Sequence, residues 1–251
     1  MYPNKFQRSG RPVGQDTRAT QDKTTTAGVM VTRGLACAEV KDYVTAAQWF
    51  RKAAECGDLY GMSNLGACYT MGWGVSQDYA EGLKWIRKAS DGGNELGMFN
   101  LGECYRLGQG VPQDDAEARR WYHKAAEAGN LQSMAILGAT YACGLGVTED
   151  WAEGVKWLRK AAEGGHPAGM AMLGEQYWLG QGVPQDYTEA VKWHRKAAEA
   201  GSPSGMYGLG NCYAYGHGVS KDGAEALKWY RKAADAGHED AQQVMKALEG
   251  Q

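Results

Sequence analysis

The sequence lacks long apolar runs, and this absence excludes several classes of protein. No stretch approaches the roughly 20 consecutive apolar residues that a membrane-spanning helix requires. Runs of Val and Ile typical of buried strands are also missing, and the 251 residues include only 3 Phe and 6 Pro. The composition therefore predicts no membrane span and argues against a fold built around a buried sheet.

The sequence also lacks an excess of charge of either sign. Its 27 basic and 29 acidic residues leave a formal net charge of −2. This near balance provides no field that would attract nucleic acid or an anionic membrane, so neither is expected as a partner. Residues 1–26 lack the apolar core of a secretory signal. We expect a cytoplasmic location, or a periplasmic or secreted one if a leader has been removed.

Patterns typical of metal sites are missing as well. The six cysteines form no Cys-x-x-Cys pair and have no Cys–His spacing typical of zinc, so we expect them to be reduced and structural. His123, His194 and His217 show no ligand spacing and are expected to be surface or interface side chains. No metal and no cofactor are predicted.

What the sequence does contain is a period of 36 residues. Asp, Trp, Ala and Gly each recur at this step along most of the chain. The recurring aspartates are Asp42, Asp78, Asp114, Asp150, Asp186 and Asp222, and the recurring tryptophans are Trp49, Trp85, Trp121, Trp157, Trp193 and Trp229. Such a period is the signature of a repeat architecture.

Each repeat is predicted to form two helices. In DYAEGLKWIRKASDGG, Asp78 is a good N-cap and Glu81 stands three residues later, close to the arrangement of a capping box. The apolar positions that follow have helical spacing, and Gly93 suits a helix end. The second helix, ELGMFNLGECYRLG, has an apolar stripe that includes Leu101 and Tyr105.

The octapeptide LGQGVPQD occurs twice, at Leu107–Asp114 and at Leu179–Asp186. A phosphate-binding loop would need a preceding strand and usually a following Lys-Ser/Thr, and neither is present. Asp114 and Asp186 would also place negative charge where an anion should bind. The octapeptide is therefore interpreted as a helix exit, a turn and the next N-cap.

The repeating unit resembles the Sel1-like repeat family, an α-solenoid relative of the tetratricopeptide repeats. The matching residues of one unit are Gly154, Trp157, Lys160, Ala161, Ala162 and Gly165, followed by Met170, Leu173, Gly174, Tyr177, Gly180, Gly182 and Val183. The resemblance implies an all-α fold, a right-handed superhelical solenoid of 36-residue helix-turn-helix repeats with a concave inner face. Neighbouring repeats would build one continuous core by stacking.

The same pattern predicts how the chain is divided. Residues 1–26 are polar and without periodicity, and they are expected to be a disordered tail. Residues 27–41 are expected to hold a tetratricopeptide-like capping helix. Five repeats are predicted to follow, with a partial sixth repeat and a cap in residues 222–251; the five span residues 42–77, 78–113, 114–149, 150–185 and 186–221.

Function is expected at inner positions that differ between repeats. By analogy with tetratricopeptides, the Met/Leu-Gly/Tyr helix would line the concave side. The candidate partner-binding residues are Phe99, Glu103, Arg106, Ala135, Ala139, Glu175, Trp178, Tyr207 and Asn211. The alanines would form the floor of a groove for an extended peptide, with larger groups on either side. The alternative is that Phe99 and Trp178 only pack between repeats.

The favoured function is a non-catalytic protein–protein interaction scaffold or adaptor, and an effector, inhibitor or immunity protein would be a form of it. Some members of the resembled family carry a penicillin-binding or β-lactamase label. Here no serine is followed by Lys three residues later, as Ser63, Ser133 and Ser204 illustrate, so we expect neither enzymatic activity nor catalytic residues. A self-assembling structural protein is the other alternative, and a monomer or weak homo-oligomer is expected.

Overall fold

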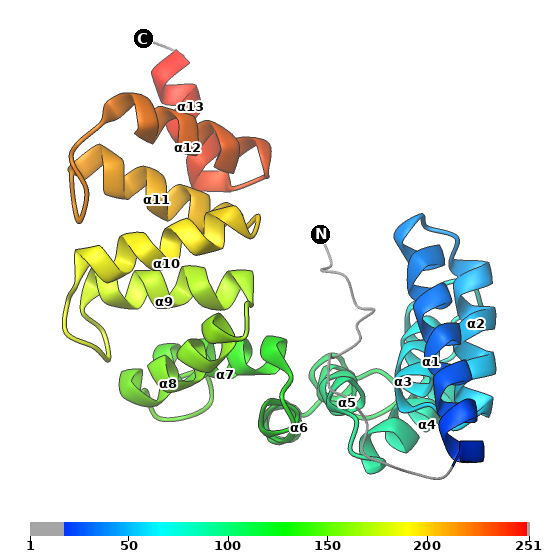
Figure 1. The fold of residues 1–251 in the computed structure, drawn as a ribbon. Coiled ribbons are helices and arrows are strands. Elements are labelled where there is room, and N and C mark those ends of the chain that lie inside the picture. The colour runs from blue at the N-terminus through cyan, green and yellow to red at the C-terminus, as the bar shows by residue number, and fades with distance from the viewer. Residues whose placement is uncertain (1–17, 250–251) are drawn as a thin grey trace. The chain divides into compact units, whose positions relative to one another are not determined.

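The computed structural model describes residues 18–249, and over this range the chain forms thirteen α-helices and no strand (Figure 1). The helices are α1 (Arg18–Glu39), α2 (Tyr43–Glu55), α3 (Leu59–Met71), α4 (Tyr79–Asp91), α5 (Glu95–Leu107), α6 (Asp115–Glu127), α7 (Leu131–Cys143), α8 (Trp151–Glu163), α9 (Pro167–Leu179), α10 (Tyr187–Glu199), α11 (Pro203–Tyr215), α12 (Gly223–Asp235) and α13 (Glu239–Glu249). The protein is thus an all-α solenoid of helix-turn-helix repeats.

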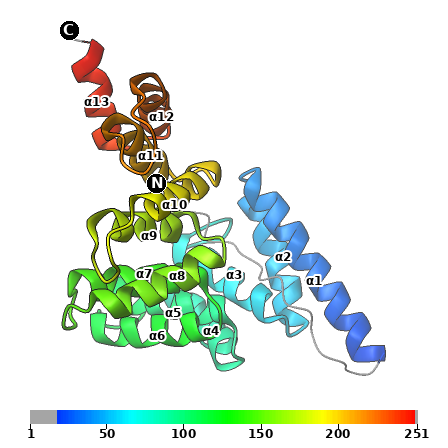
Figure 2. The ribbon, with the colours of Figure 1, turned by 60° about the vertical axis from the view of Figure 1, so that its left-hand side comes forward.

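The chain divides after Asn130 into two compact units. Unit 1 holds α1–α6 and unit 2 holds α7–α13. Within unit 1, α1 lies alongside α2, and within unit 2 the helices α9 to α12 follow one another as a stack (Figures 1 and 2). None of the described helices combines the length and the apolar character needed to cross a membrane.

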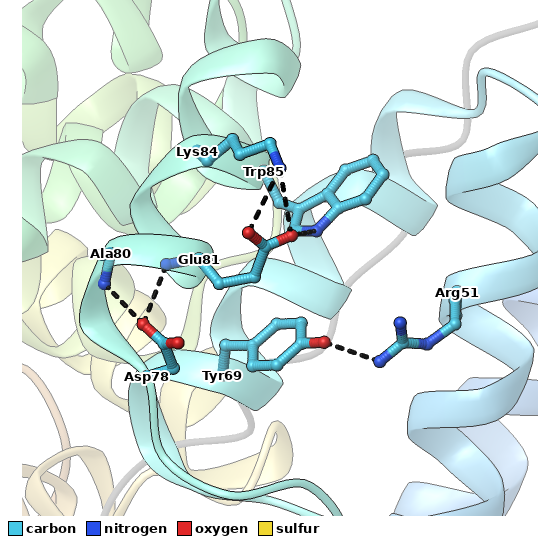
Figure 3. A network of polar contacts seen from close by, with 7 residues as sticks. All are labelled: Arg51, Tyr69, Asp78, Ala80, Glu81, Lys84 and Trp85. Atoms are coloured by element: carbon cyan, nitrogen blue, oxygen red, sulfur yellow. Dashed lines mark hydrogen bonds and ion pairs between the residues drawn. The ribbon is translucent and has the colours of Figure 1, made fainter.

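The recurring aspartates begin the even-numbered helices, as the sequence predicts. The Asp78 carboxylate accepts hydrogen bonds from the backbone N–H groups of Ala80 and Glu81, both at 3.0 Å (Figure 3). The second half of a capping box is not formed, because the Asp78 N–H donates to the Tyr69 carbonyl of the preceding helix. The Glu81 carboxylate instead accepts from Trp85 Nε1 at 2.8 Å and pairs with Lys84.

The repeated octapeptide ends one helix and leads to the next, also as predicted. In its second copy, Gly180 has φ +72° and caps α9 in the left-handed conformation. A Cβ atom at Gly182 would lie 2.3 Å from the Trp151 carbonyl oxygen, because the turn runs directly against the start of α8. Both glycines are therefore required by backbone geometry rather than by a ligand.

The core consists of columns of equivalent residues. The leucines Leu65, Leu101, Leu137, Leu173 and Leu209 are all at most 2% exposed. The repeat tryptophans are buried or half-buried, and each carries the ammonium of the lysine three residues later on its ring, at 3.9 Å for Lys124 over Trp121. Three of the neighbouring arginines, Arg51, Arg159 and Arg195, donate to a tyrosine hydroxyl of the following helix, at 2.8 Å for Arg159 and Tyr177. These arginines therefore connect helices, whereas each lysine covers a tryptophan of its own helix.

Within each unit, the odd-numbered helices lie on the inner side. In unit 2, α9 contacts both α7 and α11 in addition to its even-numbered neighbours, and in unit 1, α3 contacts both α1 and α5. Helices that reach the equivalent helix of the next repeat occupy the crowded side of a stack. The odd-numbered helices carry the Leu-Gly pairs, so the candidate positions lie on the helices that the analogy indicates.

The opening helix is longer than predicted. A helix over residues 27–39 was expected, and α1 ends there but begins at Arg18, so residues 18–26 belong to a helix and not to a disordered tail. Ala27, Val31 and Ala38 are buried. Once these residues hold α1 in place, each further helical residue towards the N-terminus adds a hydrogen bond without a new nucleation cost. The remainder of the predicted tail, residues 1–17, lies outside the described residues.

Candidate functional site

In unit 1, three candidate residues come together in a closed cluster. The Glu103 carboxylate accepts two hydrogen bonds from the Arg106 guanidinium, at 2.9 and 2.8 Å, and a further one from the Tyr122 hydroxyl. The ring of Phe99 lies 6.0 Å from that of Tyr122. Glu103 raises the pKa of Arg106, and burial raises that of Tyr122. The charges of Glu103 and Arg106 therefore neutralise each other within α5.

In unit 2, the alanine candidates expose little surface. Ala135 is 3% exposed, and Ala139 is half-buried. Trp178 packs into an aromatic cluster where α9 meets the turns: its ring lies 5.2 Å from Tyr187, 6.4 Å from Tyr215 and 4.9 Å from His217. It also contacts the core around Leu209. Trp178 therefore holds helix ends together.

The other three candidates line one pocket on the inner side of unit 2. Glu175 projects from α9, and Tyr207 and Asn211 from α11. The pocket has a volume of about 310 Å³. Its remaining lining residues are Ala168, Ala171, Met172, His194, Ser204, Gly208, His238 and Asp240. It thus lies among three successive inner helices, α9, α11 and α13, with one contribution from α10.

His194, which comes from α10, lies behind this pocket and forms its floor. Its side chain is 3% exposed, and neither ring nitrogen has a hydrogen-bond partner among the described residues. A Cβ atom at Gly174 would lie 2.8 Å from His194 Nδ1, and one at Gly208 would lie 2.5 Å from Cε1. The ring therefore fits between two helices that approach closely because both carry glycine. Burial lowers the pKa of His194 to about 4, so the ring is neutral at pH 7.

The mouth of the pocket is acidic and aromatic. Glu175 Oε2 lies 4.0 Å from His194 Nε2, too far for a hydrogen bond, and partial desolvation raises the pKa of the carboxyl group. Tyr207 stacks on His238 with ring centroids 4.5 Å apart. Asp240 adds a second carboxylate, and no Lys or Arg belongs to the lining. Among the described residues, no group of three or more metal-ligating side chains is placed to hold a metal ion.

Comparison with known proteins places this architecture in a family. The family model described as "Sel1 repeat" matches six times, over residues 28–58, 59–94, 96–130, 131–166, 167–202 and 203–238. The chain belongs to the Sel1 repeat family. The matched repeats after the first begin at odd-numbered helices, whereas each predicted unit begins at an Asp, so the period agrees and the starting point differs.

Solved structures of Sel1 repeat proteins have the same fold. A Sel1 repeat protein from Oxalobacter formigenes is 33% identical, with a TM-score of 0.78 over 88% of this chain and 90% of that one. A protective antigen from uropathogenic Escherichia coli is 36% identical, with a TM-score of 0.72 over 91% of this chain and 48% of that one. An immunity protein from Pseudomonas aeruginosa, 20% identical, has a TM-score of 0.57 over 90% and 85%. No curated protein sequence matches the chain.

The Sel1 repeats of this chain differ at one pair of positions that explains the pocket. From Ile86 onwards, the residue that follows each repeat Trp packs on the Leu-Gly glycine of the preceding helix. Three of these residues, Tyr122, His194 and Tyr230, also lie beside the polar side chain 19 positions earlier. Tyr230 donates to Asn211 Oδ1 at 2.8 Å, and Tyr122 donates to Glu103. The pairs are Ala67 with Ile86, Glu103 with Tyr122, Ala139 with Leu158, Glu175 with His194, and Asn211 with Tyr230.

In the Glu175–His194 pair the two side chains do not form a hydrogen bond. Imidazole is shorter than phenol, so His194 does not reach the carboxylate as Tyr122 reaches Glu103. His194 was expected to be a surface or interface side chain and was not among the candidates, which all came from the inner helices, but it is buried in the structure. The signal was present: among the residues that follow the repeat tryptophans, His194 is the one residue that is neither aliphatic nor an aromatic Phe or Tyr.

Proposed function

We propose that this Sel1 repeat protein is a non-catalytic interaction scaffold that binds a segment of a partner polypeptide on the inner side of unit 2. The observation that carries the proposal is the pocket among α9, α11 and α13, whose floor is a buried histidine without a hydrogen-bond partner. Buried polar groups are normally paired, and a partner's side chain would supply the missing contact.

The shape of the inner side supports an extended ligand. Three successive inner helices present side chains to the same pocket, with Met172 on α9, Tyr207 on α11 and Asp240 on α13. Met172 is 38% exposed, so it offers apolar surface beside the pocket. A pocket that combines an aromatic ring with polar groups is typical of sites where a few residues supply most of the binding energy.

Selection from a displayed library of random dodecapeptides tests the proposal. The chain is immobilised, bound peptides are selected, and their contact surface is mapped by an amide-resolved NMR titration. We expect the shifted amides to lie in α9, α11 and α13. Peptides that instead shift amides of the outer helix α8, which contributes no residue to the pocket, or a selection that yields no binding peptide, would contradict the proposal.

Two substitutions test whether the peptide binds in the pocket. Tyr207→Ala removes the tyrosine ring that lines the pocket. We expect it to weaken the binding of a selected peptide by about ten-fold or more, as loss of an aromatic contact does in other interfaces. Lys192→Ala is the matched control, because Lys192 is exposed on α10 and pairs only with Glu189 in its own helix. The control should bind the peptide as the unchanged protein does.

A further inference from the structure

We propose that the unit 2 pocket binds a basic side chain of the partner segment, with arginine bound more tightly than lysine. This inference rests on the proposed function, because it names the residue type that the scaffold recognises. It commits the pocket to one ligand chemistry, a guanidinium or ammonium group on an aliphatic stem.

The charges in the pocket favour a cation. Glu175 on α9 and Asp240 on α13 contribute two carboxylates, and no Lys or Arg lines the space. Unlike Glu103, which Arg106 neutralises in unit 1, Glu175 has no arginine or lysine partner among the described ion pairs. An incoming cation would therefore meet a carboxylate whose charge is not compensated by the protein.

The floor of the pocket supplies a neutral hydrogen-bond acceptor in addition to the two carboxylates. The ring of His194 is neutral at pH 7, so one of its nitrogens is an acceptor, and that nitrogen has no donor among the described residues. A guanidinium has donors pointing in several directions in one plane. It can pair with the Glu175 carboxylate through two N–H groups, which a single ammonium cannot do. His194 Nε2, which lies 4.0 Å from Glu175 Oε2 and is covered in this structure, would accept a further N–H after a small rotation of the ring.

The walls suit the remainder of such a side chain. Tyr207 stacks on His238 and presents its ring to the pocket, and a guanidinium is attracted to the face of an aromatic ring. Ala168, Ala171 and Met172 on α9 provide apolar surface for the methylene groups of the stem. The lining thus offers apolar surface for the stem of an arginine side chain and aromatic and acidic groups for its guanidinium.

Small probes test this chemistry directly on the full chain. The probes are the Nα-acetyl N-methylamides of arginine, lysine, norleucine and glutamate, titrated in amide-resolved NMR. We expect the arginine probe to shift the amides of Tyr207, Gly208 and Asn211 saturably, the lysine probe to do so more weakly, and the other two not to bind. Equal binding of norleucine and arginine would overturn the proposal, because it would show an apolar pocket.

Other repeats of the chain supply the variants. His194→Tyr reproduces the Glu103–Tyr122 pair and should close the pocket while Glu175 remains. The double variant Glu175→Ala/His194→Leu reproduces the Ala139–Leu158 pair, so it replaces the polar floor with a pair that this fold already accommodates. Both variants are expected to bind the arginine probe about ten-fold or more weakly than the unchanged protein does. Thermal melting followed by circular dichroism verifies that they fold.

A conservative variant separates charge from shape. Glu175→Gln keeps the volume and removes the charge, so it should weaken the arginine probe, whereas undiminished binding would overturn the proposal. The experiments also distinguish failure of the scaffold proposal from failure of the pocket proposal. Selected peptides that map to α9 and α11 but lack basic residues, with no binding of the arginine probe, would overturn the pocket assignment alone. Binding of that probe without any selected peptide would overturn the scaffold proposal alone.

Discussion

At the scale of single residues, the proposed function of this chain depends on one departure from a repeated pairing. Every other residue that follows a repeat tryptophan is either aliphatic or has an aromatic ring that fills the space, as Tyr230 does towards Asn211. His194 fills the core between Gly174 and Gly208 but ends short of Glu175. A buried polar ring without a partner lowers stability, which is consistent with a role in binding.

The buried histidine predicts a specific dependence of stability on pH. Because the pKa of His194 is lowered to about 4 in the folded state, the unfolded chain binds its proton first as pH falls. The free energy of unfolding should therefore decrease as pH falls from the unfolded pKa of about 6.5 towards 4, by up to about 3 kcal/mol from this residue. Urea unfolding at a series of pH values measures it.

The comparison that isolates His194 is between Glu175→Ala and Glu175→Ala/His194→Leu. Glu175 would otherwise act in the opposite direction, because its pKa is raised in the folded state. His166, whose pKa burial lowers, is present in both proteins and cancels. The other titratable groups at the pocket, Tyr207, His238 and Asp240, are also common to both. Identical pH profiles for the two variants would show that folding does not lower the pKa of His194.

At the scale of helices, the glycine of each Leu-Gly pair sets how closely an odd-numbered helix approaches the following even-numbered one. At Gly138 on α7, an added Cβ atom would lie 2.6 Å from two carbons of Leu158 and 3.1 Å from the Gly154 carbonyl oxygen. Neither neighbour can withdraw without moving α8. The recurring glycine is thus explained by packing of helix against helix.

This packing predicts that Gly138→Ala destabilises the protein. Alanine has the higher helix propensity, worth about 1 kcal/mol, but overpacking of a helix contact usually costs about 1–3 kcal/mol. We expect a net loss in the free energy of urea-induced unfolding. Gly223→Ala is the control, since no atom lies within 4 Å of its Cβ position at the start of α12, and it should leave stability unchanged to within about 0.5 kcal/mol. Equal effects of the two substitutions would refute the packing argument.

Helices and turns could be predicted from the sequence because their signals are local. Asp186 caps α10 through the N–H groups of Thr188 and Glu189, and these residues are adjacent in the sequence. The site was only partly accessible, because it depends on what a second helix places behind the inner one. Glu103 and Glu175 are equivalent by sequence, yet Tyr122 and Arg106 bond the first, while His194 stops short of the second.

At the scale of the whole molecule, each helix pair is stabilised mainly by its neighbours, as in other solenoids. The last helix, α13, covers α12: Met245 is buried against Ala226 and Tyr230. The same segment brings His238 and Asp240 to the pocket. The final helix therefore both closes the core of unit 2 and completes the proposed binding site.

Ending the chain after Gly237 should affect unit 2 selectively. Loss of Met245 and Val244 from the core is expected to cost at least about 3 kcal/mol, by the usual value of buried apolar side chains. Amide hydrogen exchange is expected to show lower protection in α11 and α12 and unchanged protection in α3 and α4 of unit 1. An equal loss of protection in all four helices would contradict the nearest-neighbour account.

The most direct test of the central claim is the affinity of a library-selected peptide for the unchanged protein and for His194→Tyr. The account predicts that the peptide contains a basic residue and that the variant, though folded, binds it at least about ten-fold more weakly, because the new hydroxyl occupies the pocket and bonds Glu175. Equal affinity for the two proteins would show that the partner segment does not use the pocket, and would contradict the account.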